Sequence, residues 1–200
     1  MKKVVLATRN DGKIVELRRI LAEAGLEVEL VGLGEFPHIG DVAETGLTFA
    51  ENSLLKAHAV AARSGLPAIA DDSGLCVDAL NGMPGIFSAR WSGRHGDDLA
   101  NLRLLLAQIS DVPDGRRQAH FACTAALALP TGDEHVVDGI MRGHVIREPR
   151  GTNGFGYDPI FVPDGESRTT AEMEAAEKDA ISHRGRAFRA LVPLIESAVL

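Results

Sequence analysis

The order of hydrophobic and polar positions predicts a strand, a polar loop, a helix and a second strand at the start of the chain. Residues 3–7 form a short β-branched run, and residues 8–13 are polar. Apolar residues then recur at helical spacing as far as Gly25, which predicts a helix over about 13–24 and a strand over about 26–31. This β-loop-α-β opening is typical of an α/β fold.

The next segment combines an acidic, Gly-rich loop with an alanine-rich helix. Thr48 and Glu51 have the spacing of a capping box, and Gly65 is placed to end the helix that they begin. A strand is expected over 67–70. It leads into the polar residues 71–74, which we interpret as a loop at the end of that strand.

The second half of the chain alternates between turns and strands. Residues 81–85 favour a turn, and the acidic pair 97–98 is placed to cap a helix. Alternation over 118–129, a turn at 130–133 and a second strand pattern over 135–146 predict a hairpin. Glycines in that second strand are expected to mark bulges or bends.

The C-terminal part predicts two helices. After a Gly-rich loop at 151–156, helical segments are expected near 170–178 and 183–199. Pro193 either kinks the last helix or starts a new one. The expected architecture is α/β, a mixed sheet with flanking helices in a single domain of residues 1–200 that allows a smaller lobe around 118–146.

Composition narrows the classes of partner. Of 200 residues, 45% are hydrophobic and 24% charged, and no apolar run approaches the roughly 20 residues that span a bilayer. A formal net charge of −7 argues against binding a nucleic-acid polymer, which needs a basic surface. The first predicted strand follows Met1 without room for a signal peptide, so we expect a cytoplasmic protein. Cys76 and Cys123 lie in apolar stretches and are expected to be buried, reduced thiols.

The first candidate site is the loop 8–13. Its backbone N–H groups and the following helix dipole face any bound phosphate, and Lys13 adds a full positive charge. The spacing is not that of a P-loop, so Thr8 and Asn10 would supply side-chain hydrogen bonds instead. The alternative is purely structural, a turn in which Thr8 or Asp11 caps the helix.

The second candidate site is a pair of adjacent carboxylates, Asp71 and Asp72. Successive strand residues point to opposite sides, so one can hold the fold while the other ligates a hard cation or takes a proton from water. We assign the second role to Asp72, with Glu44 as the other candidate. Asn52 and Lys56 lie one turn apart on one helix face, for which the alternative is a solvated surface.

The third candidate site combines the Gly-rich segment 151–158 with cationic residues further along. The segment holds the only tyrosine of the chain beside a phenylalanine, a composition suited to covering a planar ring. Lys178 and Arg184 add donors, and Arg184 can present a fork to two acceptors on a base. The alternatives are helix capping by Ser182 and a structural role for His183.

Together these segments resemble one family, the inosine/xanthosine triphosphate pyrophosphatases, which clear non-canonical purine nucleotides from the precursor pool. The Asp-Asp-Ser-Gly, Phe-Gly-Tyr-Asp and Ser-His-Arg segments, in this order, are the most specific. The resemblance is carried by Thr8-Arg9-Asn10-Asp11-Gly12-Lys13, Glu44-Thr45-Gly46, Phe49-Ala50-Glu51-Asn52, Ala70-Asp71-Asp72-Ser73-Gly74, Pro84-Gly85-Ile86-Phe87-Ser88-Ala89-Arg90, Gly154-Phe155-Gly156-Tyr157-Asp158-Pro159 and Ser182-His183-Arg184-Gly185.

The resemblance implies Mg2+-dependent hydrolysis of ITP, dITP and XTP to the nucleoside monophosphate and pyrophosphate, by a homodimer with two lobes around a central nucleotide-binding cleft. It implies that Asp72 is the base that activates water for attack on the α-phosphorus, and that Glu44 and Asp72 hold Mg2+. It also implies that the nucleotide is bound by Thr8, Arg9, Asn10, Asp11, Gly12, Lys13, Lys56, Ser73, Phe155, Gly156, Tyr157, Asp158, Lys178, His183 and Arg184.

Selectivity for such bases follows from hydrogen-bond polarity. A donor such as Arg184 suits a 6-oxo acceptor and would leave the 6-amino group of adenine mispaired, at a cost of about 1–3 kcal/mol. Two alternatives stay open from sequence. One is a Maf-like pyrophosphatase acting on other nucleotides, and the other is a sensor that binds a triphosphate without cutting it.

Overall fold

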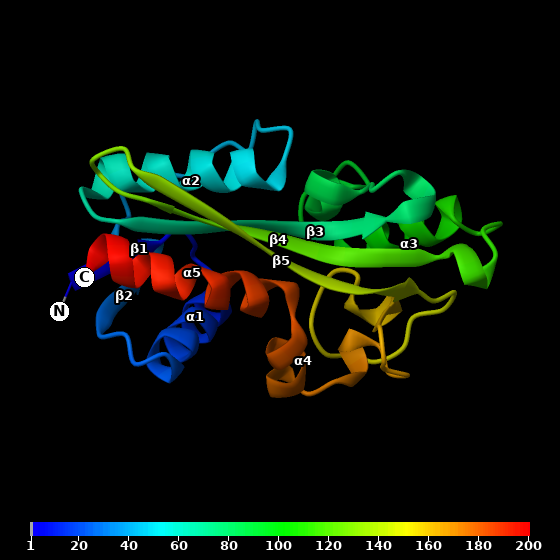
Figure 1. Cartoon of the computed structure of the whole chain (residues 1–200). Helices are drawn as coiled ribbons and strands as arrows, with labels where there is room; N and C mark the ends of the chain where they lie inside the picture. Colours follow the sequence, from blue (N-terminus) through cyan, green and yellow to red (C-terminus); the bar gives the residue numbers. More distant parts are fainter. Residues whose placement is uncertain (1) are drawn as a thin grey trace. The chain divides into compact units, whose positions relative to one another are not determined.

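The computed structural model describes residues 2–200, and it confirms an α/β fold built on one mixed sheet (Figure 1). The strand order is β2-β1-β3-β4-β5-β6. The strands are β1 (Lys2–Leu6), β2 (Val28–Gly32), β3 (Ala68–Val77), β4 (Gln118–Ala128), β5 (Glu134–Val145) and β6 (Phe161–Pro163). The α-helices are α1 (Asp11–Glu23), α2 (Phe49–Ser64), α3 (Asp98–Gln108), α4 (Ala175–Ile181) and α5 (His183–Val199).

The chain divides into two compact units. Unit 1 comprises the residues up to Asp72 together with Cys123–Gly139 and Arg184–Leu200, and unit 2 comprises Ser73–Ala122 and Ile140–His183. The predicted hairpin is present as β4 and β5, neighbours in the sheet joined by a short turn. Both hairpin strands contribute residues to both units, so the hairpin is not confined to a lobe of its own.

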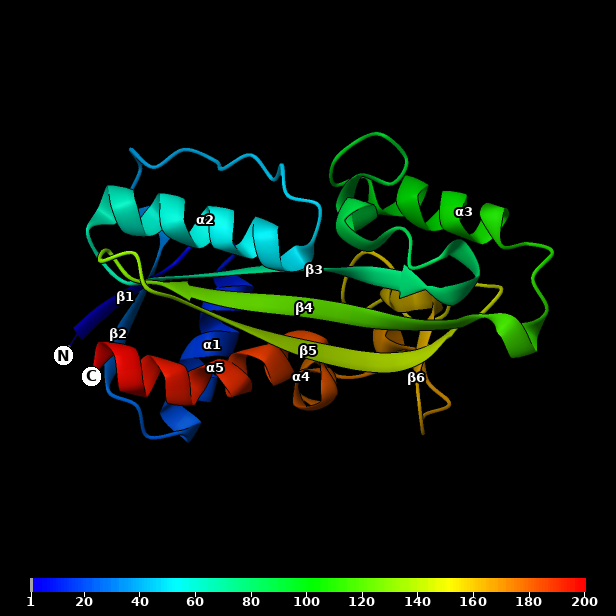
Figure 2. The ribbon, with the colours of Figure 1, turned by 45° about the horizontal axis from the view of Figure 1, so that its top comes forward.

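Unit 1 is a layered α/β structure. Strand β1 pairs in parallel with β2 and with β3, while α2 covers one face of these strands and α1 and α5 cover the other (Figures 1 and 2). Alternate residues of β1 face these two layers. Val4 and Leu6 belong to a core cluster with residues of α1 and α5, and Val5 belongs to another with residues of α2. The period of two of a β-strand is therefore what separates the two layers.

Helix α2 begins and ends where its sequence indicates. The Thr48 side chain accepts a hydrogen bond from Glu51 N–H, and Gly65 ends the helix in the left-handed conformation at φ 69°. The capping box is only half formed, because the Glu51 carboxylate accepts from the N–H of Leu47 instead of from that of Thr48. The Thr48 hydroxyl alone therefore caps the first turn.

Unit 2 packs α3 on one face of its strands (Figure 2). Asp97 caps this helix by accepting from Ala100 N–H, as predicted for the acidic pair. Gly143 was expected to mark a bulge or bend. In the structure a glycine is required there because another strand lies close to it. Gly143 pairs with Pro163 of β6, and a Cβ there would lie 2.2 Å from the carbonyl oxygen of Val162. The glycine allows β6 to approach β5.

Two expectations need correction, and one alternative left open by the sequence is decided. Residues 71–74 do not form a loop, because β3 continues to Val77 through buried apolar residues and its charged side chains find partners on both sides. The helix expected over 170–178 is a 3-10 turn at Thr170–Glu172 followed by α4, since Met173 and the next residue are extended. Pro193 lies inside a single helix, α5, and does not start a new one.

Two further features agree with the sequence. Both cysteines are buried free thiols, and burial, with Asp78 nearby, raises the pKa of Cys76 to about 11. Burial likewise raises the pKa of Cys123. No helix within residues 2–200 is long and apolar enough to cross a membrane.

Candidate active site

The polar loop after β1 is fixed by its own side chains. Thr8 Oγ1 accepts from the N–H of Asn10, and Asn10 Oδ1 accepts from the N–H groups of Gly12 and Lys13 at 2.9 and 3.3 Å. Asn10 is therefore the N-cap of α1, a role that we had considered for Thr8 or Asp11. The cap directs the first turn of the helix and places Lys13 on it.

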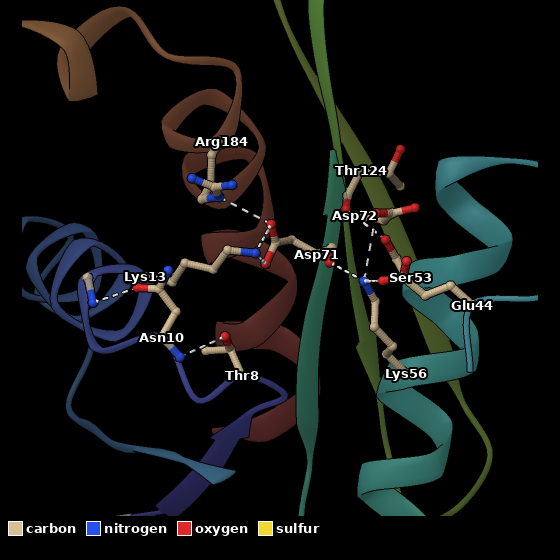
Figure 3. Close-up of polar contacts among 11 residues, drawn as sticks. Thr8, Asn10, Lys13, Glu44, Ser53, Lys56, Asp71, Asp72, Thr124 and Arg184 are labelled. Atoms are coloured by element: carbon tan, nitrogen blue, oxygen red, sulfur yellow. Dashed lines mark hydrogen bonds and ion pairs between the residues drawn. The ribbon is translucent and has the colours of Figure 1, made fainter. Parts of the chain in front are cut away.

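The pairing of β1 with β3 brings this loop to Asp71. Ala7 N–H donates to the carbonyl oxygen of Ile69 at 2.7 Å, so the carboxyl end of β1 lies beside the start of β3, two residues before Asp71. Lys13 Nζ lies 2.9 Å from both carboxylate oxygens of Asp71, and Arg184 Nε lies 3.1 Å from Oδ2 (Figure 3). Asp71 thus holds cations from α1 and α5 on one carboxylate.

The charge state of Asp71 is set by these neighbours. Burial alone would raise the pKa of this carboxyl, which is only 3% exposed. Attraction to Lys13 and Arg184, with the hydrogen bond from Lys13, outweighs burial and holds the pKa of Asp71 well below its usual range. The pKa of Arg184 is in turn raised, because attraction to Asp71 outweighs the effect of burial. Asp71 and Arg184 are therefore both ionised at neutral pH.

Asp72 points to the opposite side of β3, as the alternation of a strand requires (Figure 3). Its Oδ2 accepts from Asn52 Nδ2 at 3.0 Å, and its Oδ1 lies 3.8 Å from Lys56 Nζ. The Lys56 ammonium also donates to Glu44 Oε1 and to the carbonyl oxygen of Asp71, both at 2.7 Å. The two carboxylates proposed as metal ligands are thus close enough to share one cation.

This donor set fits Mg2+. Among residues 2–200 there is no group of three or more His, Cys, Asp or Glu side chains arranged to hold a metal. Mg2+ does not need such a cage, because it prefers oxygen ligands and is commonly held by one or two carboxylates, water and substrate phosphate. Glu44 and Asp72 supply two carboxylates around a position where a positive charge is stabilised.

Not every residue of the first loop faces Asp71. Arg9 instead donates to Asp41 Oδ1 at 3.0 Å and to the carbonyl oxygen of Ile39 at 2.8 Å. Asp11 lies in the first turn of α1, where a negative charge is favourable. Arg9 is therefore turned toward residues 39–41, and its predicted role in binding the nucleotide stays a prediction.

A second group of the candidate residues lies in unit 2. Asp158 is buried, and its Oδ2 accepts from Phe155 N–H at 2.9 Å and from Lys178 Nζ at 2.5 Å. The Lys178 ammonium lies 5.2 Å from the centre of the Phe155 ring. The ring itself is 62% exposed, so this group presents an aromatic surface beside a positive charge.

Other residues of this unit are packed inside it. Tyr157 is buried and its hydroxyl donates to the carbonyl oxygen of Ser88 at 2.9 Å, so of the two aromatic residues in the segment only Phe155 offers its ring to a base. His183 is buried and stacks on Phe121 with ring centres 4.9 Å apart, which favours the structural reading. Ser73, the residue after Asp72 in β3, is half-buried.

The sequence did not identify some residues that organise both groups. Asp71 was expected only to hold the fold, yet it orients Lys13 and Arg184 and accepts from Lys56. Thr170 donates to Asp158 Oδ1 at 2.8 Å, and Asp98 accepts from the N–H of Gly156 at 2.9 Å. The sequence did point to Asp71, because it lies next to Asp72. Thr170 and Asp98 lie in segments far from Asp158 and Gly156 in the sequence, and only the fold brings them together.

Known protein sequences identify the family of this chain. The sequence pattern of the Ham1 family matches residues 4–194. This chain belongs to the Ham1 family. A dITP/XTP pyrophosphatase of Streptomyces coelicolor is 68% identical over 195 residues, which cover 98% of each chain. The predicted resemblance is therefore confirmed, and membership argues against the Maf-like alternative.

Solved structures of the Ham1 family share the fold. A nucleoside-triphosphatase / dITP/XTP pyrophosphatase from Mycobacterium abscessus is 56% identical, with a TM-score of 0.81 over 96% of this chain and 99% of that chain. A HAM1 protein from Coxiella burnetii is 41% identical, with a TM-score of 0.91 over 99% of this chain and 100% of that one. The arrangement of strands and helices is thus that of the family.

Proposed function

We propose that this chain hydrolyses the triphosphates of non-canonical purine nucleosides, ITP, dITP and XTP, to the monophosphate and pyrophosphate. The observation that carries the proposal is the pair of carboxylates Asp72 and Glu44, which share the ammonium of Lys56 in a chain 68% identical to a dITP/XTP pyrophosphatase. A buried or partly buried carboxylate pair beside several cations suits the cleavage of a polyanion.

In this proposal Asp72 is the general base. Its Oδ2 is held by Asn52, which leaves Oδ1 directed toward Lys56 and able to take a proton from water. The water oxygen forms a bond to the α-phosphorus, the bond from that phosphorus to the bridging oxygen breaks, and the electron pair leaves with pyrophosphate. No covalent intermediate with the protein is needed.

The cations of unit 1 would bind the triphosphate. Lys13 carries a full positive charge on the first turn of α1, where the helix dipole also favours an anion. Lys56 would add a second contact when it leaves the carboxylates. Mg2+, held by Glu44 and Asp72, would supply further neutralisation of phosphate charge.

The base would be bound by residues of unit 2. Phe155 offers an exposed ring for stacking, and Lys178 adds a donor that suits the 6-oxo group of hypoxanthine or xanthine. Arg184, which we expected at the base, has its Nε on Asp71. We therefore propose that Arg184 contributes to the phosphate group of cations as well as to base recognition.

The decisive experiment measures release of pyrophosphate, as distinct from orthophosphate, from ITP, XTP, ATP and GTP with Mg2+. We expect pyrophosphate from ITP and XTP, and loss of at least about a hundredfold in kcat for Asp72→Asn, since general base catalysis contributes about 10²–10⁴. Equal cleavage of ATP would contradict the proposed selectivity. Binding of ITP without any product would favour the sensor.

We further infer a homodimer and a cytoplasmic location, where the nucleotide pool is found. In β5 the large apolar side chains of Val136 and Ile140 are 38% and 37% exposed, which supports the central hairpin as the contact surface. Analytical ultracentrifugation of the protein and of Val136→Glu tests this. A monomeric native chain would contradict it.

A further inference from the structure

The carboxylate of Asp158 has both of its oxygens engaged inside unit 2. Oδ2 accepts from Phe155 N–H at 2.9 Å and from Lys178 Nζ at 2.5 Å, and Oδ1 accepts from Thr170 Oγ1 at 2.8 Å. The residue is 3% exposed and Thr170 is fully buried. A carboxylate so placed is oriented by the protein and turned away from solvent, which is unlike a group that meets a ligand directly.

One oxygen of Asp158 joins the exposed Phe155 to Lys178, whose side chain is 17% exposed. Phe155 lies in the loop before it and Lys178 lies on α4, twenty residues further along the chain. Because both donate to Oδ2, the Lys178 ammonium is held over the Phe155 ring, 5.2 Å from its centre. The cation is thereby fixed next to the ring, and Phe155 remains 62% exposed for contact with a planar ligand.

The loop is built to admit this carboxylate. Gly154 has φ +74°, and a Cβ at that position would lie 2.1 Å from Asp158 Oδ2. On the far side of Phe155, the N–H of Gly156 donates to Asp98 Oδ2 at 2.9 Å. The exposed aromatic residue thus stands between a glycine that lies against the Asp158 carboxylate and a glycine anchored to Asp98, and its own N–H is held by Asp158.

We propose that Asp158 is a positioning residue for base recognition, which acts through Phe155 and Lys178 and does not itself touch the nucleotide. It fixes ring and ammonium in the arrangement that receives a 6-oxo purine, so binding does not have to order them. This inference rests on the proposed function for its ligand. It differs from the role implied by the resemblance, in which Asp158 is a direct contact.

Asp158→Asn tests the proposal because the amide keeps the shape of the side chain and removes the charge that holds Lys178. Calorimetry would measure binding of IMP, AMP and pyrophosphate separately, without turnover. We expect the Kd for IMP to rise about tenfold, as for loss of a hydrogen bond to a charged group, and the IMP preference over AMP to fall. The Kd for pyrophosphate should stay unchanged, because pyrophosphate has no base.

A double-mutant cycle separates positioning from direct contact. If Asp158 acts through Lys178, Asp158→Asn combined with Lys178→Met should bind IMP no more weakly than Lys178→Met alone. Losses that add, or an unchanged Kd for IMP in Asp158→Asn, would overturn the inference. Native protein that binds pyrophosphate but not IMP would instead contradict the proposed function.

Two further variants disturb the contacts of Asp158 without replacing Asp158 itself. Thr170→Val removes the hydrogen bond to Oδ1 and keeps the charge of Asp158, so we expect a smaller loss of IMP affinity in the same direction. Gly154→Ala crowds Oδ2 directly and should reproduce the loss seen with Asp158→Asn. Pyrophosphate binding serves as the common control for all variants, and an equal loss there would overturn the inference.

Discussion

The Lys13 ammonium lies 2.9 Å from both carboxylate oxygens of Asp71, on the side of β3 opposite to Asp72. Two adjacent aspartates therefore belong to two different charge clusters. Asp71 is matched by Lys13 and Arg184, and Asp72 lies with Glu44 around Lys56. The separation is a direct result of strand geometry, because successive side chains of a strand point to opposite faces.

Loss of the Asp71 charge should destabilise the protein. Asp71→Asn leaves two largely buried cations facing a neutral amide, so we expect the free energy of unfolding at pH 7 to fall by about 3 kcal/mol, measured by urea denaturation. Asp41→Asn is the matched control. Its ion pair with Arg9 involves a carboxylate that is 98% exposed, so a change below about 1 kcal/mol is expected. Equal effects would contradict this account.

The stabilisation that Asp71 provides should depend on pH. The folded pKa of Asp71 is depressed, so its contribution is fully present above the unfolded value of about 3.9 and is lost only as pH falls through the folded pKa. The stability difference between native protein and Asp71→Asn should therefore be constant from neutral pH to about pH 5 and shrink at lower pH. A difference that disappears between pH 8 and 6 would contradict the assignment.

Lys56→Met should strengthen metal binding to the substrate-free protein. The ammonium shares the oxygens of Glu44 and Asp72, so a divalent cation must displace it and overcome its repulsion. We expect Mn2+ to bind about tenfold more tightly, measured by loss of the free Mn2+ paramagnetic resonance signal. Lys13→Met, which removes a cation held by Asp71, is the control and should change the affinity less. Weaker binding by Lys56→Met would contradict the prediction.

The two aromatic residues of the segment 155–157 should respond differently to substitution. Phe155→Ala removes an exposed ring, so we expect weaker IMP binding by about 1–3 kcal/mol with unchanged stability. Tyr157→Phe removes the donor to the Ser88 carbonyl, so stability should fall by about 1–2 kcal/mol while IMP binding is kept. Thermal unfolding and calorimetry of both variants test this, and the reverse pattern would place Tyr157 at the base.

Arg117 should be far more important for stability than its neighbour Arg147. Its guanidinium is 2% exposed and donates to the carbonyl oxygens of Ile109, Val145 and Ile146. A lysine cannot reach all three, so Arg117→Lys should lower the free energy of unfolding by about 2–3 kcal/mol. Arg147 also donates to two carbonyls, but its side chain is 49% exposed, and Arg147→Lys should cost less than about 1 kcal/mol. Urea denaturation measures both.

Local patterns were enough to predict most elements of the chain. The β-branched run of β1, the alternation in β4, the Thr48 cap and the left-handed Gly65 all depend on interactions within a few residues, and the structure agrees with them. The opposite orientation of Asp71 and Asp72 also followed from the period of a strand. Local signals failed where tertiary partners intervene, as at Asp71–Gly74, where cations on both sides stabilise charged residues inside β3.

The sequence by itself determined the α/β class, the resemblance to the inosine/xanthosine triphosphate pyrophosphatases and the loops in which the chemistry was sought, because these depend on residue type and short-range order. Only the tertiary structure decided which side chains share a partner. It brought Lys13 to Asp71 across 58 residues of sequence and Arg184 across 113, and it placed Tyr157 inside unit 2 while leaving Phe155 exposed. Such choices depend on burial and on the compensation of charge between segments distant along the chain, which no local pattern encodes.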